Sequence, residues 1–189
     1  MIAATPLSDS IVKLRRLQEA NGSIRKTQLL REFQDDANFR NFLYYALNPM
    51  LTYKISEQTL RSPTLYDSAI TLTMTDIFSV CELLSKRKAL DAGTVYQVCA
   101  FVQSSPPDEA DVYIKLLSKT LRLGVTAKTV NKVIPNLIPE WEVQQAYPID
   151  KYPLKEGTEF WLTQKLNGVR ATYYKGRLYA RSGVPYEGP

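Results

Sequence analysis

The sequence predicts an α+β protein in which an all-α part precedes a short β-rich part. Over the first two thirds of the chain, apolar residues recur at every third or fourth position, as they do on the buried face of a helix. After about Pro139 the period changes to two, which is typical of strands. We therefore expect a helical domain at 1–139, a linker at 140–158 and the start of a strand-containing domain at 159–189.

Capping residues, prolines and glycines mark the ends of the expected helices. The predicted starts are Ser8, Ser23, Asp35 or Asp36, Asp76, the residues after Gly93, Pro106-Pro107 and Thr126. The predicted stops are Asn21-Gly22, Asn48-Pro49, the Lys86-Arg87-Lys88 run, the surroundings of Gly124, and the stretch before Pro135. Ile24 is expected on the buried side of the second helix. Met50 to Leu72 shows no clear helical period, so we expect it to be irregular.

Three short strands are predicted near the end of the chain, at Phe160 to Leu166, Val169 to Tyr174 and Leu178 to Arg181. Lys175-Gly176 joins the second strand to the third. A meander of about 30 residues buries too little apolar surface to be stable alone. We therefore expect that the chain is cut from a longer protein; the alternative is that the strands dock on the helices.

Composition narrows the possible chemistry. The 189 residues include no histidine, which removes the commonest general base, and two cysteines are too few for a cysteine-only zinc site. Cys81 and Cys99 lie in apolar helical patterns typical of buried thiols. The net charge of +5 permits a polyanionic partner. The chain has no apolar run of membrane-spanning length and no signal-peptide pattern at its start, so we expect a cytoplasmic protein with no membrane partner.

The run from Gln164 to Arg170 is the most informative motif of the chain. Lys165 is followed by Gly168 at the third position and by Arg170 at the fifth. This spacing suits a nucleophilic lysine with backbone room for a phosphate and a guanidinium to bind it. The alternative interpretation is an ordinary hairpin turn, because Asn-Gly is the strongest short hairpin signal.

Separated segments of the chain resemble one family. Lys165-Leu166-Asn167-Gly168-Val169-Arg170 resembles the lysine motif of the covalent nucleotidyltransferases, usually Lys-x-Asp-Gly-x-Arg, and Arg181-Ser182-Gly183 resembles their second motif. Upstream, the segments 123–126, 131–133 and 135–139 resemble the end of the helical DNA-binding domain of phage and bacterial ATP-dependent DNA ligases. RNA ligases and capping enzymes share the lysine motif but lack this helical domain. The ordered combination therefore favours a DNA ligase.

The resemblance implies a helical DNA-binding domain followed by the first strands of an incomplete nucleotidyltransferase domain. It implies an enzyme that seals nicks in duplex DNA, with ATP and Mg²⁺ as cofactors, acting as a monomer. Lys165 would attack the α-phosphate of ATP to give a lysyl-adenylate, the adenylate would pass to the 5′-phosphate of the nick, and the 3′-hydroxyl would displace AMP. The nucleotide-binding residues that it implies are Asn167, Gly168, Arg170 and Arg181.

The resemblance also implies which residues contact the DNA backbone. Nick binding needs cations and hydroxyl groups that face phosphates. The first candidate cluster is Lys86, Arg87 and Lys88, for which a solvated helix C-terminus is the alternative interpretation. The second is Thr126, Lys128, Thr129, Asn131 and Lys132.

One departure from the family pattern keeps other functions open. Asn167 stands where the family has an aspartate, so an acceptor is kept but the charge is lost. The later motifs of the family and its C-terminal OB domain would lie beyond Pro189, so we expect this chain not to be competent alone. The alternatives are a shortened, non-catalytic module that binds nicked DNA, and a helical interaction protein with an incidental hairpin.

Overall fold

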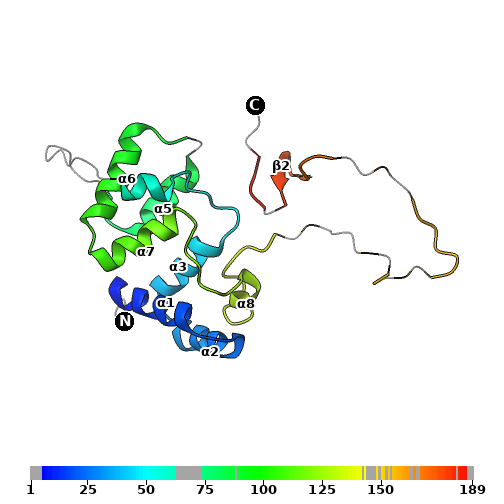
Figure 1. The fold of residues 1–189 in the computed structure, drawn as a ribbon, viewed down its shortest axis with the longest axis horizontal. Coiled ribbons are helices and arrows are strands. Elements are labelled where there is room, and N and C mark those ends of the chain that lie inside the picture. The colour runs from blue at the N-terminus through cyan, green and yellow to red at the C-terminus, as the bar shows by residue number, and fades with distance from the viewer. Residues whose placement is uncertain are drawn as a thin grey trace. The chain divides into compact units, whose positions relative to one another are not determined.

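The computed structural model describes residues 6–62, 74–87, 89–141, 143, 148, 150–151, 153, 155–161, 164, 167–181 and 183–186. The chain divides into two compact units, Met1–Glu140 and Trp141–Pro189. The described part of the first unit is helical, and that of the second contains a β-hairpin (Figure 1).

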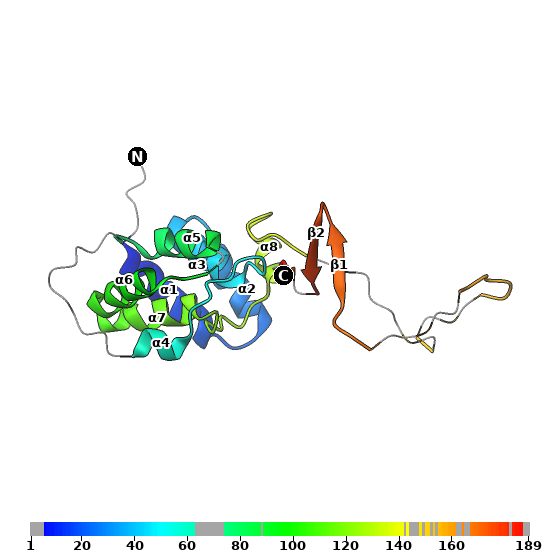
Figure 2. The same cartoon turned by 90° about the horizontal axis from the view of Figure 1, so that it is seen from above.

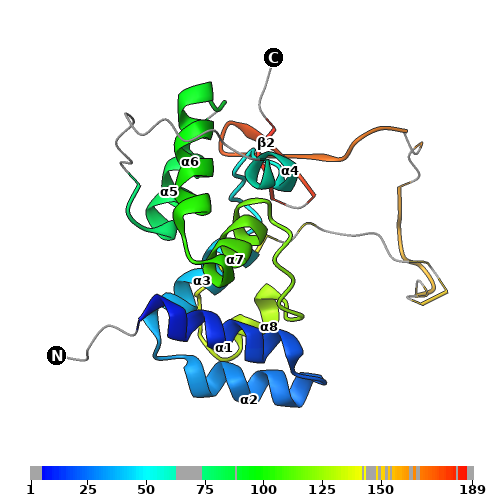
Figure 3. The same ribbon diagram turned by 60° about the vertical axis from the view of Figure 1, so that its left-hand side comes forward.

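The first unit is a bundle of helices. Within its described residues the helices are α1 (Leu7–Glu19), α2 (Ser23–Phe33), α3 (Ala37–Leu47), α4 (Glu57–Arg61), α5 (Ile77–Lys86), α6 (Ala92–Ser104), α7 (Pro107–Leu117) and α8 (Ala127–Asn131). Helix α1 packs against α2, α3 and α7, and α6 packs against α4 and α7. Helix α8 packs on α2, at the α1–α2 end of the bundle (Figure 3).

Aspartate and threonine side chains cap helices where the sequence predicted caps. The side chains that accept a hydrogen bond from a first-turn amide at the predicted starts are Asp36, Asp76 and Thr126. The predicted caps Ser8 and Ser23 are corrected, because both lie inside the first turns of α1 and α2. Pro6 occupies the cap position of α1, and its carbonyl already accepts from the amides of Asp9 and Ser10, so the helix begins before Ser8 can cap it.

Three further sequence predictions differ from the structure. Helix α4 lies in the stretch expected to be irregular; at five residues it is too short to show a period, and the Ser56 hydroxyl caps it. Helix α7 ends at Leu117 rather than near Gly124, because Lys119 has a φ of 59°, which no helix accommodates. Ile24 is 77% exposed, since its position on α2 is rotated by about 180° from Phe33, which faces the core.

The buried apolar side chains of the first unit form one core, to which every described helix contributes. The largest fully buried side chains include Tyr53, Phe39 and Phe42. Cys81 and Cys99 are buried and unbridged, which confirms the interpretation of both as structural thiols. None of the described helices is both long enough and apolar enough to span a membrane.

Asp36 links α1 to α3 through a buried polar cluster. Its carboxylate accepts hydrogen bonds from the Ser10 hydroxyl at 2.9 Å, the Lys13 ammonium at 2.5 Å and the Phe39 amide at 3.0 Å. Burial alone would raise the pKa of Asp36, but these three donors outweigh it and hold the pKa below its ordinary value. The aspartate therefore caps α3 and fixes α1 against it at the same time.

Lys119 joins the loop after α7 to the end of α3. Its ammonium donates to the carbonyl oxygens of Tyr45, Ala46 and Asn48 at 3.0, 3.2 and 2.9 Å. The last carbonyl groups of a helix have no backbone amide within the helix to donate to them. A cation at this end also interacts favourably with the negative end of the helix dipole. Burial lowers the pKa of Lys119 to about 8. This contact anchors the start of the 118–126 loop.

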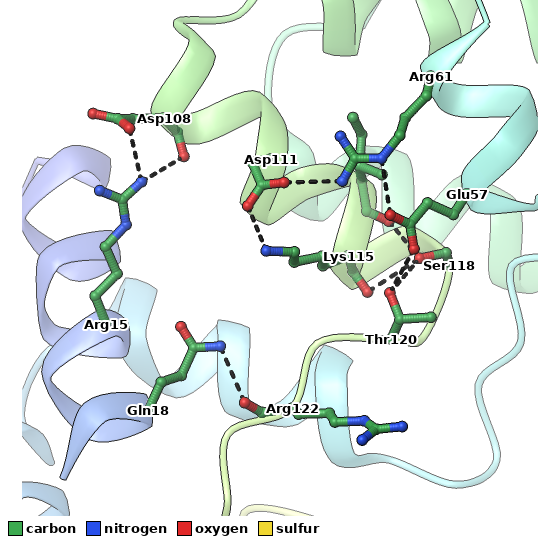
Figure 4. A network of polar contacts seen from close by, with 11 residues as sticks. Arg15, Gln18, Glu57, Arg61, Asp108, Asp111, Lys115, Ser118, Thr120 and Arg122 are labelled. Carbon is green, nitrogen blue, oxygen red and sulfur yellow. Dashed lines mark hydrogen bonds and ion pairs between the residues drawn. The ribbon is translucent and has the colours of Figure 1, made fainter.

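A chain of charged groups fastens α4 to α7 and to the same loop. The Arg61 guanidinium lies 2.8 Å from Glu57 and 2.9 Å from Asp111, and Lys115 lies 2.6 Å from Asp111 (Figure 4). The Thr120 hydroxyl donates to Glu57 at 3.3 Å. Hydrogen bonds from Lys115 and Arg61 hold the pKa of Asp111 below its ordinary value.

The second unit contains an antiparallel hairpin of β1 (Ala171–Tyr174) and β2 (Arg177–Ala180), visible in Figure 2. Lys175 and Gly176 form its turn with φ values of 46° and 81°. Two successive positive φ values are the signature of a type I′ turn, whose twist matches that of the strands. The predicted hairpin and its turn are thus confirmed.

The predicted strand at 160–166 is not found in the described residues. Phe160, Trp161 and Gln164 are not part of a strand, because no described strand lies beside them to accept their hydrogen bonds. Gly168 is not among the residues with positive φ, so Asn167-Gly168 does not adopt a type I′ turn. Residues 165 and 166, which a hairpin at this point needs, lie outside the described residues, so the hairpin interpretation of the lysine motif stays an alternative.

Candidate nucleic-acid interface and nucleotide site

The first predicted DNA-binding cluster lies at the end of α5, where its described charges are paired within the chain. The Lys86 ammonium lies 2.5 Å from Glu82, one turn back on the same helix. The Arg87 guanidinium donates to Asp91 at 2.6 Å and to the Thr94 hydroxyl at 2.7 Å. Lys88, the third member, lies outside the described residues.

Arg87 belongs to the capping network of α6. Asp91 caps that helix by accepting from the Thr94 amide at 2.8 Å, and the Thr94 hydroxyl donates to the same carboxylate at 2.7 Å. These hydrogen bonds from Thr94, together with Arg87, hold the pKa of Asp91 below its ordinary value. The guanidinium therefore neutralises a carboxylate that stays ionised, and the positive charge at this corner is largely cancelled.

The second predicted cluster lies on α8 and its flanks. The Thr126 hydroxyl accepts from the Thr129 amide at 3.2 Å, and the two threonine hydroxyl oxygens lie 3.0 Å apart. Lys128 and Lys132 are exposed. Among the described residues Lys132 has no carboxylate partner. The structure thus brings two hydroxyl groups and two exposed lysines onto one short segment.

Asn131, predicted in the same cluster, uses its amide within the chain. Its Nδ2 donates to the Ile138 carbonyl and to the Glu140 carboxylate, each at 2.8 Å, and its Oδ1 accepts from the Ile138 amide at 3.0 Å. The side chain holds the 132–140 loop against α8. Its contact with DNA stays a prediction, while its structural role is visible.

Two residues that sequence reasoning did not select hold the loop in front of α8. The Gln18 side chain on α1 donates to the Arg122 carbonyl at 3.0 Å, as Figure 4 shows. The Lys26 ammonium on α2 donates to the Leu123 carbonyl at 3.1 Å. Both donors lie about a hundred residues from the loop in the chain, so no local pattern could have indicated them.

Arg122 adds a further cation beside the second cluster. In Figure 4 its guanidinium points away from α1, with no partner among the residues drawn, while its carbonyl faces Gln18. Its neighbours Leu121 and Leu123 are buried. Successive side chains of an extended segment point to opposite sides, so burying the two leucines turns Arg122 outward.

The hairpin of the second unit places two predicted nucleotide-binding arginines together. Arg170 immediately precedes β1 and Arg181 immediately follows β2, and Ala171 pairs with Ala180. Both arginines therefore lie at the open end of the hairpin, and both are exposed. Guanidinium groups bind phosphate oxygens well, so two exposed arginines at one end of a hairpin are compatible with a phosphate ligand.

The other predicted nucleotide-site residues are described only in part. Asn167 and Gly168 are exposed, and a Cβ atom on Gly168 would meet no atom within 4 Å, so the backbone is open to a ligand. Lys165 lies outside the described residues.

Trp141 supports the hairpin from one face. Its ring lies 4.7 Å from the Tyr179 ring and 6.2 Å from the Tyr174 ring, centroid to centroid. Gly183 has a φ of 88°, and a Cβ atom there would lie 2.8 Å from Trp141. The glycine of the predicted second motif is thus required both by its backbone conformation and by this tryptophan.

The described residues thus comprise a helical unit with exposed lysines at 128 and 132, and a hairpin with exposed arginines at 170 and 181. No family model matches the chain. It is 26% identical over 127 residues to the DNA ligase of Enterobacteria phage T4, a match that covers 62% of this chain and 26% of the relative. The DNA ligase of phage T6 matches with the same values. The chain therefore spans about a quarter of the length of these relatives.

A solved structure, Pmar-Lig_PreS3, shares the fold. It superposes with a TM-score of 0.65 at 19% identity, over 94% of this chain and 43% of that one. The two phage relatives agree with the resemblance to DNA ligases that the motifs indicated. The mostly helical structure with one small antiparallel sheet also agrees with the predicted α+β class.

Proposed function

We propose that this chain acts in the ATP-dependent sealing of nicks in duplex DNA, as part of a DNA ligase. The observation that carries the proposal is the match of 127 residues to the phage T4 enzyme. In this assignment, residues 1–139 bind the duplex, 140–158 form a linker and 159–189 begin the adenylation domain.

The duplex-binding surface of the helical part is the segment 121–132. Its cations and hydroxyl groups contact phosphates, which position a duplex without reading its sequence. Support comes from the exposure of Lys128 and Lys132 and from the unpaired guanidinium of Arg122 among the described residues. Lys86 and Arg87 contribute less, because carboxylates on their own side of the bundle already neutralise them.

Lys165 is the proposed nucleophile. Its neutral amine forms a bond to the α-phosphorus of ATP, and the bond from that phosphorus to the oxygen bridging to the β-phosphate breaks, so that pyrophosphate leaves. The nitrogen, which carries a positive charge once it is bonded to phosphorus, then releases one proton to solvent. Arg170 and Arg181, together at the open end of the hairpin, bind the phosphates during this step. Among the described residues, no three acidic, cysteine or histidine side chains lie together as ligands for Mg²⁺.

The first test is binding of this chain to a nicked duplex and to an intact duplex of equal length, at two salt concentrations. Salt-sensitive binding is expected, because released counterions make phosphate contacts weaken with added salt. The double variant Lys128→Gln/Lys132→Gln should bind much more weakly. Its control, Arg15→Gln/Arg16→Gln, removes the same charge from side chains already paired with Asp108 and Glu32. An absence of binding at low salt would overturn the proposal.

A second candidate function is a module that binds nicked DNA without ligating it. Asn167 favours it, because the family has a carboxylate at that position. Transfer of labelled AMP from ATP onto a chain that continues past Pro189 through the later motifs of the family, compared with its Lys165→Ala variant, separates the two functions. A label that depends on Lys165 supports the ligase, whereas DNA binding without a label, and none after Asn167→Asp, supports the module.

A further inference from the structure

Lys26 lies against Gly124 in the loop in front of α8. Lys26 lies on α2, and its ammonium donates to the Leu123 carbonyl at 3.1 Å. A Cβ atom on Gly124 would lie 2.0 Å from this nitrogen and 3.3 Å from the adjoining carbon. The end of the lysine side chain therefore crosses directly over the α-carbon of Gly124.

Gly124 meets two independent requirements. Its φ of 66° lies in the left-handed region, which costs other residues free energy. Even a residue that tolerates this φ would push its Cβ into the Lys26 ammonium. The glycine in the sequence motif is thus matched to a lysine that lies about a hundred residues away.

The loop is held from both sides at this point. Leu121 and Leu123 are buried in the core beneath it. From outside, Gln18 and Lys26 bind two successive carbonyl groups, those of Arg122 and Leu123. The chain then enters α8 within three residues, where the Thr126 hydroxyl caps the helix. Only a few backbone dihedral angles therefore separate the bound carbonyls of Arg122 and Leu123 from the first residue of α8.

We propose that Lys26 is a positioning residue for duplex binding. Its ammonium clasps the Leu123–Gly124 turn, and the turn sets the direction in which Lys128 and Lys132 leave α8 toward the DNA backbone. This inference rests on the proposed function. It assigns Lys26 a role through the loop rather than through a phosphate, because its ammonium is already directed at a carbonyl.

The test compares Lys26→Ala with Arg25→Ala, its neighbour on the same helix. Both variants remove one positive charge, but Arg25 is exposed and its guanidinium donates to Gln28 at 3.5 Å, a weak contact within the same helix. Lys26→Ala should weaken duplex binding about fivefold, as expected for losing one hydrogen bond that restrains the loop. Arg25→Ala should change it far less. The slope of log affinity against log salt should stay unchanged for Lys26→Ala, since no phosphate contact is lost.

Gly124→Ala provides the second arm, because it keeps every charge and yet displaces the ammonium. It should reproduce the loss seen in Lys26→Ala, and the double variant should lose less than the sum of both, because each change breaks the same clasp. Lys26→Arg should restore most of the affinity. Circular dichroism and thermal unfolding of each variant establish that the helices are kept.

Three results would overturn the positioning role. Equal binding by Lys26→Ala and Arg25→Ala would leave the proposed function standing and remove the clasp from it. A salt slope lower by about 1 in Lys26→Ala would make Lys26 a direct phosphate contact. If the unaltered chain binds no duplex, the proposed function and this inference fall together.

Discussion

The two basic corners of the helical unit carry similar residue types but use their charges differently. At the end of α5, Lys86 and Arg87 face carboxylates, and Arg87 is tied into the cap of α6. At α8, by contrast, Lys132 faces solvent and has no ion-pair partner among the described residues. A run of basic residues in a sequence therefore does not by itself identify a polyanion-binding surface, because cations paired with carboxylates add less positive potential to the surface than unpaired ones.

The difference has a structural cause. A helix C-terminus attracts cations through its dipole, so lysine and arginine at the end of α5 also stabilise the fold. The segment before α8 is instead an extended loop whose carbonyls are bound by Gln18 and Lys26. With these two carbonyls bound by side chains of α1 and α2, this segment can direct the Arg122 guanidinium outward.

The sharpest test of the comparison removes the charges of the α8 corner. Lys128→Gln/Lys132→Gln should weaken duplex binding roughly 100-fold at low salt, if each lysine contributes about 1.5 kcal/mol as a charge-assisted contact. The slope of log affinity against log salt should fall by about 2, one for each lost phosphate contact. Fluorescence anisotropy over a salt series measures both quantities. The same loss in Lys86→Gln would show that the two corners are equivalent.

Asp36, unlike the lysines at α8, is a buried charged group whose hydrogen bonds all lie within the fold among the described residues. Asp36→Ala should lower the free energy of unfolding by about 2 kcal/mol, from the lost cap of α3 and the buried Ser10 hydroxyl left without its acceptor. Urea unfolding followed by circular dichroism measures the change. Duplex affinity, measured under conditions where the variant is folded, should be unaltered. A loss of affinity in the folded variant would contradict the separation of structural from binding charges.

Arg87 should behave like Asp36 on a smaller scale. Arg87→Gln removes the guanidinium that joins Asp91 and Thr94, so the thermal midpoint should fall slightly while duplex affinity changes little. The matched variant Lys132→Gln should show the reverse, with weaker binding and an unchanged midpoint. Differential scanning fluorimetry and binding, measured side by side, test the pair. A clear loss of affinity in Arg87→Gln would return the α5 corner to the binding surface.

Acid should reveal the smallest of these effects. The pKa of Asp36 is lower in the folded chain than in the unfolded one, so its contribution to stability is present above the unfolded pKa. That contribution is lost as the pH falls through the folded pKa. The stability difference between the unaltered chain and Asp36→Asn should therefore shrink below about pH 4. Urea unfolding at a series of acidic pH values measures it, and a difference that does not depend on pH would remove the ionised carboxylate from the α1–α3 contact.

Sequence patterns predicted the long elements of this protein. The caps at Asp36 and Asp76 and the stop at Asn48 depend on local hydrogen bonds and fixed dihedral angles, which neighbouring residues decide. The Lys175-Gly176 turn was predictable for the same reason. Asn167-Gly168 carries an equally strong local signal, yet Gly168 has no positive φ and so does not take part in a type I′ turn.

The order of segments and the motif residues, all local in the chain, were sufficient to indicate the DNA-ligase resemblance from the sequence alone. Tertiary structure decided how the charges are used. It paired Arg87 with Asp91, engaged both ends of the Asn131 amide, and brought Lys26 across Gly124. The Lys26 contact joins residues about a hundred positions apart. The Arg87 and Asn131 contacts join residues closer in the sequence, but they too depend on how the chain turns after each helix. Hydrogen bonds and ion pairs of this kind depend on distances in space, which only the packing of the helices sets.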